Sequence, residues 1–356
     1  MFIRNCWYVA AWDYEVQSEG FLSRTITNTP LIFWRDAQGE IIAMQDRCCH
    51  RGAKLSKGRL EDGGNCVRCM YHGLVFDRTG QCVSAPAQDR IPPQVRIRTY
   101  PVVQQHRWVW IWMGDPEKAD RSLIPDTQWL DHPEWRSLPG YLHYDVNYLL
   151  IVDNLLDFSH LPFVHPTTLG GSPDYAAVLP KVQRLDRGVR LSKWVPNTQP
   201  PPYSAKYSNY AVGAPVDRWM YYDFLVPGVL LMDSGMMPAG TGGQDRHREN
   251  AIAFRGCQAL TPETESSTHY FFAHPHNFLI DRPEVTQEIH AGVIQAFEED
   301  RDMITAQHEN LAQDPGFKMV PLSVDAALSQ FRWVVDRLIK SEQPAEGERG
   351  KSSVAA

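Results

Sequence analysis

Two short segments of this chain each place a cysteine beside a histidine at metal-binding spacing. The first is Cys48-Cys49-His50 and the second is Cys69-Met70-Tyr71-His72. Two loops that each offer one thiolate and one imidazole fit a [2Fe-2S] cluster in which two Cys bind one iron and two His bind the other. Because imidazole is neutral where thiolate is anionic, such a cluster accepts electrons more readily than an all-Cys cluster. Cys48, His50, Cys69 and His72 are therefore predicted to bind an electron-carrying cluster.

The competing interpretation of these four residues is a zinc site. Zinc fingers usually pair Cys with Cys and His with His at short intervals, whereas each motif here mixes the two ligand types. A disulfide is also disfavoured, since the chain has seven cysteines, an odd number, and no export signal. Cys49, Cys66 and Cys82 lie near the motifs and are interpreted as small buried side chains without a ligand role.

A second constellation lies in residues 153–165, where His160 and His165 follow acidic groups. Non-haem Fe(II) oxygenases bind iron with two His and one carboxylate on one face of the metal, which leaves the other face open to O2. Apolar residues at helical spacing predict a helix from Tyr148 that ends near His160, and Pro162 then lets His165 turn back. Asp157, three residues before His160, shares its helix face and could accept the second NH of its imidazole.

A histidine pair at this spacing is often structural, with its hydrogen bonds satisfied in a polar core. The predicted cluster favours the metal interpretation, because an electron carrier needs a site that consumes electrons. The carboxylate ligand must come from elsewhere, and an acidic run lies on a helix predicted near the C-terminus. Helical periodicity puts Asp300 on the inward face of Phe297 and Ile304. The other acids of this run are better placed for solvent: Glu298, Glu299 and Asp302.

The elements that must position these residues form two groups along the chain. From Trp7 to about Trp112, short β-rich runs alternate with turn signals such as Asp77-Arg78-Thr79-Gly80 and predict a compact antiparallel β domain. Residues 178–273 again carry strand-like segments, and a helical pattern returns at about Pro283. We expect a β domain over residues 1–115, a metal-binding domain over 116–340 and a disordered tail over 341–356.

Composition excludes several classes of protein. Hydrophobic residues make up 43% and charged residues 22% of the 356-residue chain, as is ordinary for a globular protein, and the formal charge of −7 argues against a nucleic-acid binder. No segment is long and apolar enough to span a bilayer, so no membrane role and a cytoplasmic location are expected. Tyr, Phe and Trp are frequent enough to line a pocket for a flat aromatic substrate.

Two sets of basic residues could recognise partners. One set surrounds the predicted cluster and could steer an acidic electron donor to it, although the same charges suit solvated loops: Arg47, Arg51, Lys54, Lys57, Arg59 and Arg68. The other set lies within residues 200–295, which we expect to line the substrate pocket. These arginines could pair with a carboxylate or sulfonate, or could simply be exposed: Arg218, Arg246, Arg248 and Arg255.

With both motifs in place, the sequence resembles the oxygenase component of Rieske non-haem iron oxygenases over nearly its whole length. The similarity is carried by Asn5-Cys6-Trp7-Tyr8-Val9-Ala10, by Tyr71-His72-Gly73-Leu74, by residues 110–116 and by Val152-Asp153-Asn154-Leu155-Leu156-Asp157. These segments look like the branch that contains vanillate and dicamba O-demethylases and toluenesulfonate methyl-monooxygenase. The runs Phe2-Ile3-Arg4-Asn5-Cys6 and His165-Pro166-Thr167-Thr168-Leu169 look most like the last of these.

The resemblance implies an α+β protein with an N-terminal all-β Rieske [2Fe-2S] domain and a helix-grip (START-like) catalytic domain, in which an antiparallel sheet wraps around a long C-terminal helix. It implies a Rieske cluster on Cys48, His50, Cys69 and His72, and mononuclear Fe(II) on His160, His165 and Asp300. Asn154 matches a position near the iron that is sometimes a distant ligand. A head-to-tail homotrimer is also implied, in which electrons cross from one subunit's cluster to the neighbour's iron through a bridging aspartate that Asp157 matches.

The implied activity is that of a monooxygenase. NAD(P)H would reduce a separate flavin and iron-sulfur reductase, which passes electrons to the cluster, and O2 would be used to hydroxylate a methyl group of an aromatic substrate. A methyl bonded to oxygen or nitrogen would be lost as formaldehyde, whereas a ring methyl would become an alcohol. Two alternatives stay open: a ring-hydroxylating dioxygenase with a second small subunit, and a Rieske electron-transfer protein that holds only the irons of its cluster.

Overall fold

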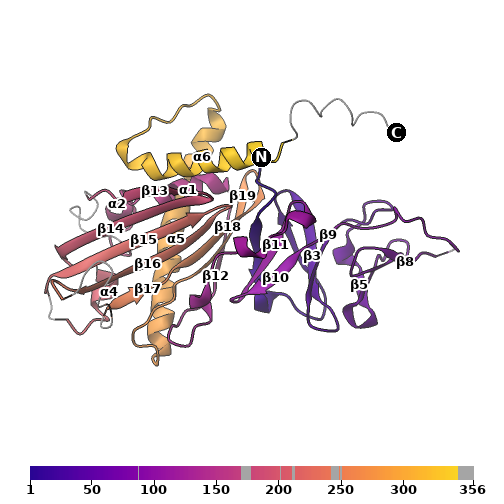
Figure 1. Cartoon of the computed structure of the whole chain (residues 1–356), viewed down its shortest axis with the longest axis horizontal. Coiled ribbons are helices and arrows are strands. Elements are labelled where there is room, and N and C mark those ends of the chain that lie inside the picture. Colours follow the sequence, from indigo (N-terminus) through magenta and orange to yellow (C-terminus); the bar gives the residue numbers. More distant parts are fainter. Residues whose placement is uncertain are drawn as a thin grey trace.

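The computed structural model describes residues 1–86, 88–169, 178–200, 202–210, 213–241, 248 and 251–343. Figure 1 shows a β-rich N-terminal part beside a larger part in which helices accompany one broad sheet. The expected fold is confirmed: an all-β domain precedes a domain with an antiparallel sheet and a long C-terminal helix. Among the described residues, no helix combines the length and the apolar content that crossing a membrane requires.

The described N-terminal residues form three small antiparallel sheets. Their strand orders are β1-β11-β10, β2-β3-β4-β9 and β5-β6-β7-β8. The strands are β1 (Trp7–Trp12), β2 (Leu22–Ile26), β3 (Thr29–Arg35), β4 (Ile41–Gln45), β5 (Arg59–Glu61), β6 (Cys66–Arg68), β7 (Val75–Asp77), β8 (Cys82–Ser84), β9 (Thr99–Tyr100), β10 (Val102–Gln105) and β11 (Trp108–Trp112). The predicted turn after β7 is confirmed, since Gly80 has a φ of +81° and its NH donates to the Asp77 carbonyl at 2.9 Å.

The larger part is built on an eight-stranded antiparallel sheet of order β12-β19-β18-β16-β15-β14-β13, with β17 paired to β16. Its strands are β12 (Gly140–Tyr144), β13 (Lys181–Leu185), β14 (Gly188–Thr198), β15 (Val216–Leu225), β16 (Val229–Pro238), β17 (Ile252–Phe254), β18 (Cys257–Thr264) and β19 (Ser267–Ala273). The helices are α1 (Tyr148–Leu156), α2 (Leu161–Val164), α4 (Pro202–Ala205), α5 (Pro283–Gln313) and α6 (Ala326–Ser341).

Short 3-10 helices lie in the connections of both parts. They are η1 (Asp13–Glu15), η2 (Leu55–Lys57), η3 (Asp62–Gly64), η4 (Pro116–Lys118), η5 (Arg121–Leu123), η6 (Gln128–Leu130) and η7 (Ser323–Asp325). Three of these, η4 to η6, occupy the segment between β11 and β12.

Strand register assigns the side chains of the large sheet to two faces. Met220 of β15 lies opposite Lys193 of β14 and Ser234 of β16, so these side chains share one face, which we call the inner face. Helix α5 lies against it, and the ring of Phe297 stacks on Tyr270 of β19 at 5.0 Å. Helix α6 covers the same face, where Phe331 meets Phe224 of β15 at 4.9 Å.

The outer face of the large sheet carries the contact with the N-terminal part. Tryptophans of β1 and β11 form one apolar cluster with side chains of β16, β18 and β19, among them Val229, Cys257 and Phe271. Trp12 also donates its indole NH to the carbonyl of Gly140 in β12 at 3.0 Å. The two parts therefore share a buried interface rather than a flexible link.

The tail expected at 341–356 is ordered at its start. Ser341 is the last residue of α6, and the carboxylate of Glu342 accepts hydrogen bonds from the backbone NH groups of Arg4 and Asn5, each at 2.7 Å. Residues 344–356 lie outside the described residues.

Replacing Phe331 with alanine should lower the free energy of unfolding by about 3–5 kcal/mol, because the ring is fully buried between α6 and the inner face. The matched control is Trp333→Ala on the same helix, since Trp333 is 49% exposed and should cost under about 1 kcal/mol. Denaturant unfolding followed by far-ultraviolet circular dichroism measures both. Equal losses in the two variants would contradict the placement of α6.

Candidate metal centres and the adjoining cavity

The segment that carries His160 and His165 is two short helices with a break between them. Helix α1 ends at Leu156, and the next helix spans only Leu161–Val164. The prediction of one helix ending near His160 was therefore wrong by about a turn. Pro162 does not stop a helix but lies in the first turn of α2, where its missing NH costs no hydrogen bond. His160 directly precedes α2 and His165 directly follows it, so one short helical turn separates the two imidazoles.

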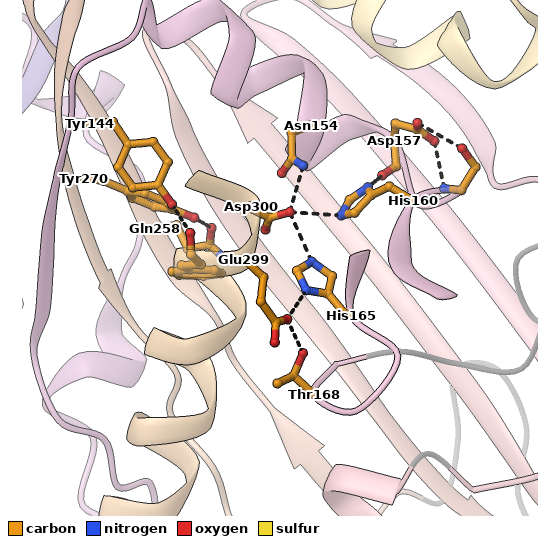
Figure 2. Close-up of polar contacts among 12 residues, drawn as sticks. Tyr144, Asn154, Asp157, His160, His165, Thr168, Gln258, Tyr270, Glu299 and Asp300 are labelled. Atoms are coloured by element: carbon orange, nitrogen blue, oxygen red, sulfur yellow. Dashed lines mark hydrogen bonds and ion pairs between the residues drawn. The ribbon is translucent and has the colours of Figure 1, made fainter. Parts of the chain in front are cut away.

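The structure brings both histidines against Asp300 of α5 (Figure 2). One donor atom from each of the three side chains lies within 4.8 Å of the others. Asp300 Oδ1 is 3.1 Å from His165 Nε2 and 3.5 Å from His160 Nε2. Asp300 is 5% exposed and His165 is fully buried, so the site is largely shielded from water. Among the described residues, no other group of His, Cys, Asp and Glu is gathered this closely.

In each of the two imidazoles a hydrogen bond holds Nδ1, so that Nε2 faces Asp300. Nδ1 of His160 donates to the backbone carbonyl of Asp157 at 2.6 Å, and Nδ1 of His165 donates to Glu299 Oε2 at 2.8 Å. Thr168 Oγ1 donates to the same carboxylate oxygen at 2.6 Å (Figure 2). Partners of this kind fix the tautomer of a ligand histidine and raise its basicity.

Two details of the sequence interpretation need correction. The backbone of Asp157, not its carboxylate, accepts from His160; the carboxylate instead accepts from the NH and the hydroxyl of Ser159 at 2.8 and 2.9 Å. Glu299 was assigned to solvent, yet it orients His165. Helical periodicity cannot reveal this role, because Glu299 lies about 100° around the helix from Asp300. The usable signal was an acid directly beside a predicted ligand.

The electrostatics of the site favour a bound positive charge. Burial alone would lower the pKa of His165, but the nearby carboxylates of Asp300 and Glu299 raise it above the ordinary value. Burial lowers the pKa of His160. The hydrogen bonds from His165 and Thr168 outweigh burial and lower the pKa of Glu299, which keeps that carboxylate charged. The Asp300 carboxylate and the two imidazoles thus surround a point that attracts a cation, and Glu299 adds negative charge on the far side of His165.

Two buried polar atoms at this point have no hydrogen-bond partner among the described residues: His165 Nε2 and Asn154 Oδ1. Asn154 Nδ2 donates to Asp300 Oδ1 at 2.9 Å, which holds its carbonyl oxygen beside the same site. Buried polar atoms are normally satisfied, so orphans gathered at one point indicate a missing ligand. The donor set fits the two-His, one-carboxylate pattern that binds non-haem Fe(II).

A cavity adjoins the three side chains on the inner face of the sheet. Most of its walls are apolar or aromatic, including Phe158, Met220, Met232, Val293 and Phe297. Its polar lining comes from Asn154, Arg218, Tyr222, Ser234, Gln258 and His274, besides the three residues at the candidate metal site. Such a lining suits an aromatic guest held by a few polar contacts.

The four arginines proposed for the pocket differ in position and in their partners. Arg218 lines the cavity and is 6% exposed. Arg248 and Arg255 pair with Asp233, whose register puts it on the outer face, and they stack over Trp219 at 4.5 Å and Trp129 at 4.8 Å. Arg246 lies outside the described residues.

The two Cys-His motifs form a pair of matching loops between strands of the N-terminal part. In the first loop the Cys48 carbonyl accepts from Gly52 NH at 2.9 Å, and Cys48 NH donates to Ala53 at 2.8 Å. In the second the same bonds link Cys69 with Gly73 and Leu74 at the same distances. Both glycines have φ above +70°, which suits glycine in a tight loop.

These loops bring the four predicted cluster ligands together. The imidazole rings of His50 and His72 lie 4.5 Å apart, and the thiol of Cys48 lies near that of Cys69. Both cysteines are buried, while His50 is exposed, so the histidine side of the group faces outward. Burial raises the pKa of the Cys48 thiol to about 11, so a metal is needed to hold it as thiolate at neutral pH. All seven cysteines are free thiols, in agreement with the sequence prediction.

The predicted basic patch near these loops is smaller than the sequence suggests. Arg59 and Arg68 both bind Glu61, at 2.9 and 2.6 Å, and Arg68 also donates to the carbonyl of Gly73 at 2.9 Å. Arg68 therefore supports the second loop from within. The remaining members are Arg47, Arg51, Lys54 and Lys57, all exposed.

Comparison with known proteins identifies both parts of the chain. The family model of the Rieske [2Fe-2S] domain matches residues 6–101. The family model of the vanillate O-demethylase oxygenase C-terminal domain matches residues 144–341. The iron-sulfur subunit of the toluene-4-sulfonate monooxygenase system of Comamonas testosteroni is 48% identical over 96% of this chain and 98% of its own. The vanillate O-demethylase oxygenase subunit of a Pseudomonas species is 35% identical over 97% of each chain.

A similar solved structure is that of dicamba monooxygenase bound to dicamba. It is 36% identical, covers 96% of this chain and 98% of its own, and has a TM-score of 0.86. A structure of the same protein with non-haem iron and dicamba has a TM-score of 0.79 at 34% identity, over 96% of this chain and 98% of its own.

Replacing Glu299 with glutamine should weaken Fe(II) binding by about 10- to 100-fold, because the hydrogen bond to His165 loses its charge. Competition with a ferrous chelator measures the affinity. The matched control is Glu298→Gln, since Glu298 pairs with Arg301 and not with either histidine. Equal affinity in the two variants would refute an orienting role for Glu299.

Proposed function

The chain belongs to the Rieske non-haem iron oxygenases whose oxygenase components carry the vanillate O-demethylase C-terminal domain, and we propose that it hydroxylates a methyl group of an aromatic substrate. It is the terminal oxygenase of a multicomponent monooxygenase system. One atom of O2 would enter a carbon-hydrogen bond of the methyl group, and the other would leave as water with two electrons and two protons. The names of the relatives connect them with toluene-4-sulfonate, vanillate and dicamba.

One observation carries the proposal: His160, His165 and Asp300 present their donor atoms to a common point at the wall of a largely apolar cavity. A purely electron-carrying protein has no use for such a site, so the observation disfavours that alternative. Similarity to monooxygenase components along the whole chain disfavours the dioxygenase alternative.

We assign the metal ligands by this geometry. His160, His165 and Asp300 would hold one Fe(II), with Asn154 beside it, and Cys48, His50, Cys69 and His72 would hold a [2Fe-2S] cluster. When bound, the cluster would supply electrons and the iron would activate O2. Glu299 and the Asp157 carbonyl hold the two imidazoles in orientation, and the buried position of Asp300 excludes water. The assignment divides the chain into a Rieske domain over 1–115 and a catalytic domain over 116–340.

Electrons would have to travel between subunits. The second Cys-His loop joins β6 and β7, and Figure 1 shows the outer strands of their sheet, β5 and β8, at the opposite end of the molecule from α2. A head-to-tail homotrimer would bring one subunit's cluster loop beside the next subunit's α1 and α2. Asp157 lies at the end of α1, and its backbone carbonyl accepts the hydrogen bond that orients His160. Its carboxylate would bridge the cluster of one subunit and the iron of the next.

The electrons would come from NAD(P)H through a separate flavin and iron-sulfur reductase. The names of the relatives denote single components of larger systems, which supports a separate partner chain. The outward-facing histidines and the exposed basic residues around the loops offer a place for an acidic donor to dock. Substrates with the methyl on oxygen or nitrogen would lose it as formaldehyde, and a ring methyl would become an alcohol.

Replacing His160 with alanine should abolish turnover and remove the mononuclear iron, while the visible absorbance of the cluster survives. Iron analysis should fall from three irons per chain to two, as expected for one iron beside a [2Fe-2S] cluster. The control is His308→Ala, further along α5. Loss of the cluster absorbance in the His160 variant would contradict the assignment of two separate centres.

Replacing Asp157 with asparagine should nearly abolish turnover with both metal contents unchanged, because the bridge loses its carboxylate. Rapid mixing of the reduced, substrate-bound enzyme with O2 should show slow reoxidation of the cluster. Ser159→Ala removes one hydrogen bond to Asp157 but keeps the carboxylate, so it should stay active. Equal inactivation by both substitutions would indicate that Asp157 only stabilises the turn.

A further inference from the structure

The cavity beside the candidate iron site is small for an aromatic guest. Its volume is about 70 Å³. An apolar cavity that takes up benzene has a volume of roughly 150 Å³, and pockets for small-molecule ligands usually exceed about 300 Å³. The methyl-bearing end of an aromatic substrate would fit beside the iron ligands, but the rest of the molecule needs further space.

A second cavity adjoins the first. Its volume is about 420 Å³, and three residues belong to the walls of both cavities: Leu169, His274 and Val293. Apolar side chains of α5 and of the sheet line much of it, among them Ile289 and Phe254. Its wall also includes exposed residues of α5, such as Ala291 and Gln295, so this cavity reaches the surface. We call the shared stretch of wall the junction.

Gly292 leaves the second cavity wide where α5 forms its wall. It lies in the interior of the helix, a position at which glycine is less favourable than alanine. A Cβ atom built at Gly292 meets no heavy atom within 4 Å outside the neighbouring helix backbone. Close packing therefore does not require a glycine here, whereas a longer side chain would project into the cavity and narrow it.

His274 is the polar residue of the junction. Its ring lies 4.8 Å from that of Phe254, and neither of its nitrogens has a hydrogen-bond partner among the described residues. Burial, with a smaller contribution from nearby His276, lowers the pKa of His274 to about 3. The imidazole is therefore neutral at neutral pH and offers one NH donor and one nitrogen acceptor. Because polar groups in a protein interior are normally paired, a ligand at the junction would complete these hydrogen bonds.

A neutral imidazole limits the kind of group that it would bind. A hydroxyl group can accept from the imidazole NH or donate to the other nitrogen. A carboxylate or sulfonate can only accept, and it would bring a negative charge beside apolar side chains such as Leu169 and Val293. The junction therefore favours a hydroxyl group over an oxyanion.

We propose that the substrate site extends through the junction into the second cavity, and that His274 binds a hydroxyl group of the aromatic substrate there. This rests on the proposed function and narrows its substrates to hydroxylated arenes. The methyl-bearing end would lie in the small cavity and the remainder of the molecule in the second one. Gly292 would then determine how large that remainder can be.

The first test is His274→Phe, which keeps a ring at the junction but removes both nitrogens. Binding to the fully metallated enzyme is measured by titration calorimetry without reductant, with 2-methoxyphenol and methoxybenzene, which differ by one hydroxyl group. The wild type should bind 2-methoxyphenol about 3- to 10-fold more tightly, as one hydrogen bond predicts, and the variant should bind the two equally. A preference that survives the substitution, or that the wild type lacks, would overturn the role of His274.

The second test is Gly292→Leu, which fills part of the second cavity and should weaken the binding of both probes by about 10-fold or more. The matched control is Ala306→Leu, at an exposed position further along α5, which should leave both affinities unchanged. Equal affinities in the wild type and both leucine variants would contradict the extension of the site. Because binding is measured without turnover, a protein that passes both tests yet oxidises no aromatic methyl group would refute the proposed function alone.

Discussion

The convergence of three donor atoms on one buried point is the constraint on which the catalytic domain depends. Two of the side chains flank a single short helix, and the third comes from α5, far away in the sequence. A sub-ångström geometry across that separation requires rigid supports. The inner face of the sheet supplies one through the stacking of Tyr270 on Phe297, and Tyr144 supplies another by donating a hydrogen bond from its hydroxyl to the Phe297 carbonyl. Both contacts fix α5 one turn before Asp300, so the aromatic core sets the position of the carboxylate.

Much of this arrangement could be predicted from the sequence, and the reason differs between residues. The Cys-His motifs combine two metal-binding residue types at short spacing, so metal binding can be predicted from them without a structure. Asp300 was predicted because its inward face follows from the 3.6-residue period of α5, which the structure confirms by its burial. The end of α1 was misplaced because propensity allows the helix to continue, whereas the capping turn at Asp157 and Ser159 ends it earlier.

The roles of other residues could not be predicted from the sequence, because they depend on which face of a strand a side chain occupies. The sequence does not distinguish three of the arginines: Arg218, Arg248 and Arg255. Strand register places Arg218 on the face of the cavity, whereas Arg248 and Arg255 form ion pairs with Asp233 on the outer face. A shift of one residue would exchange the faces. Glu299 was missed for a related reason: its role exists only because α2 brings His165 and Thr168 alongside α5. Such roles arise from tertiary contacts that local pattern does not encode.

The hydrogen bonds from Arg4 and Asn5 to Glu342 make the two ends of the folded chain one structural unit. The carboxylate that closes the last helix also anchors the backbone just ahead of β1, and β1 belongs to the tryptophan cluster between the two domains. Trimming the polypeptide for crystallisation must therefore stop beyond Glu342. A cut at the end of α6 would loosen the entry into β1 from the far end of the sequence, because Gln343, the last described residue, still contacts Met1 at 3.7 Å.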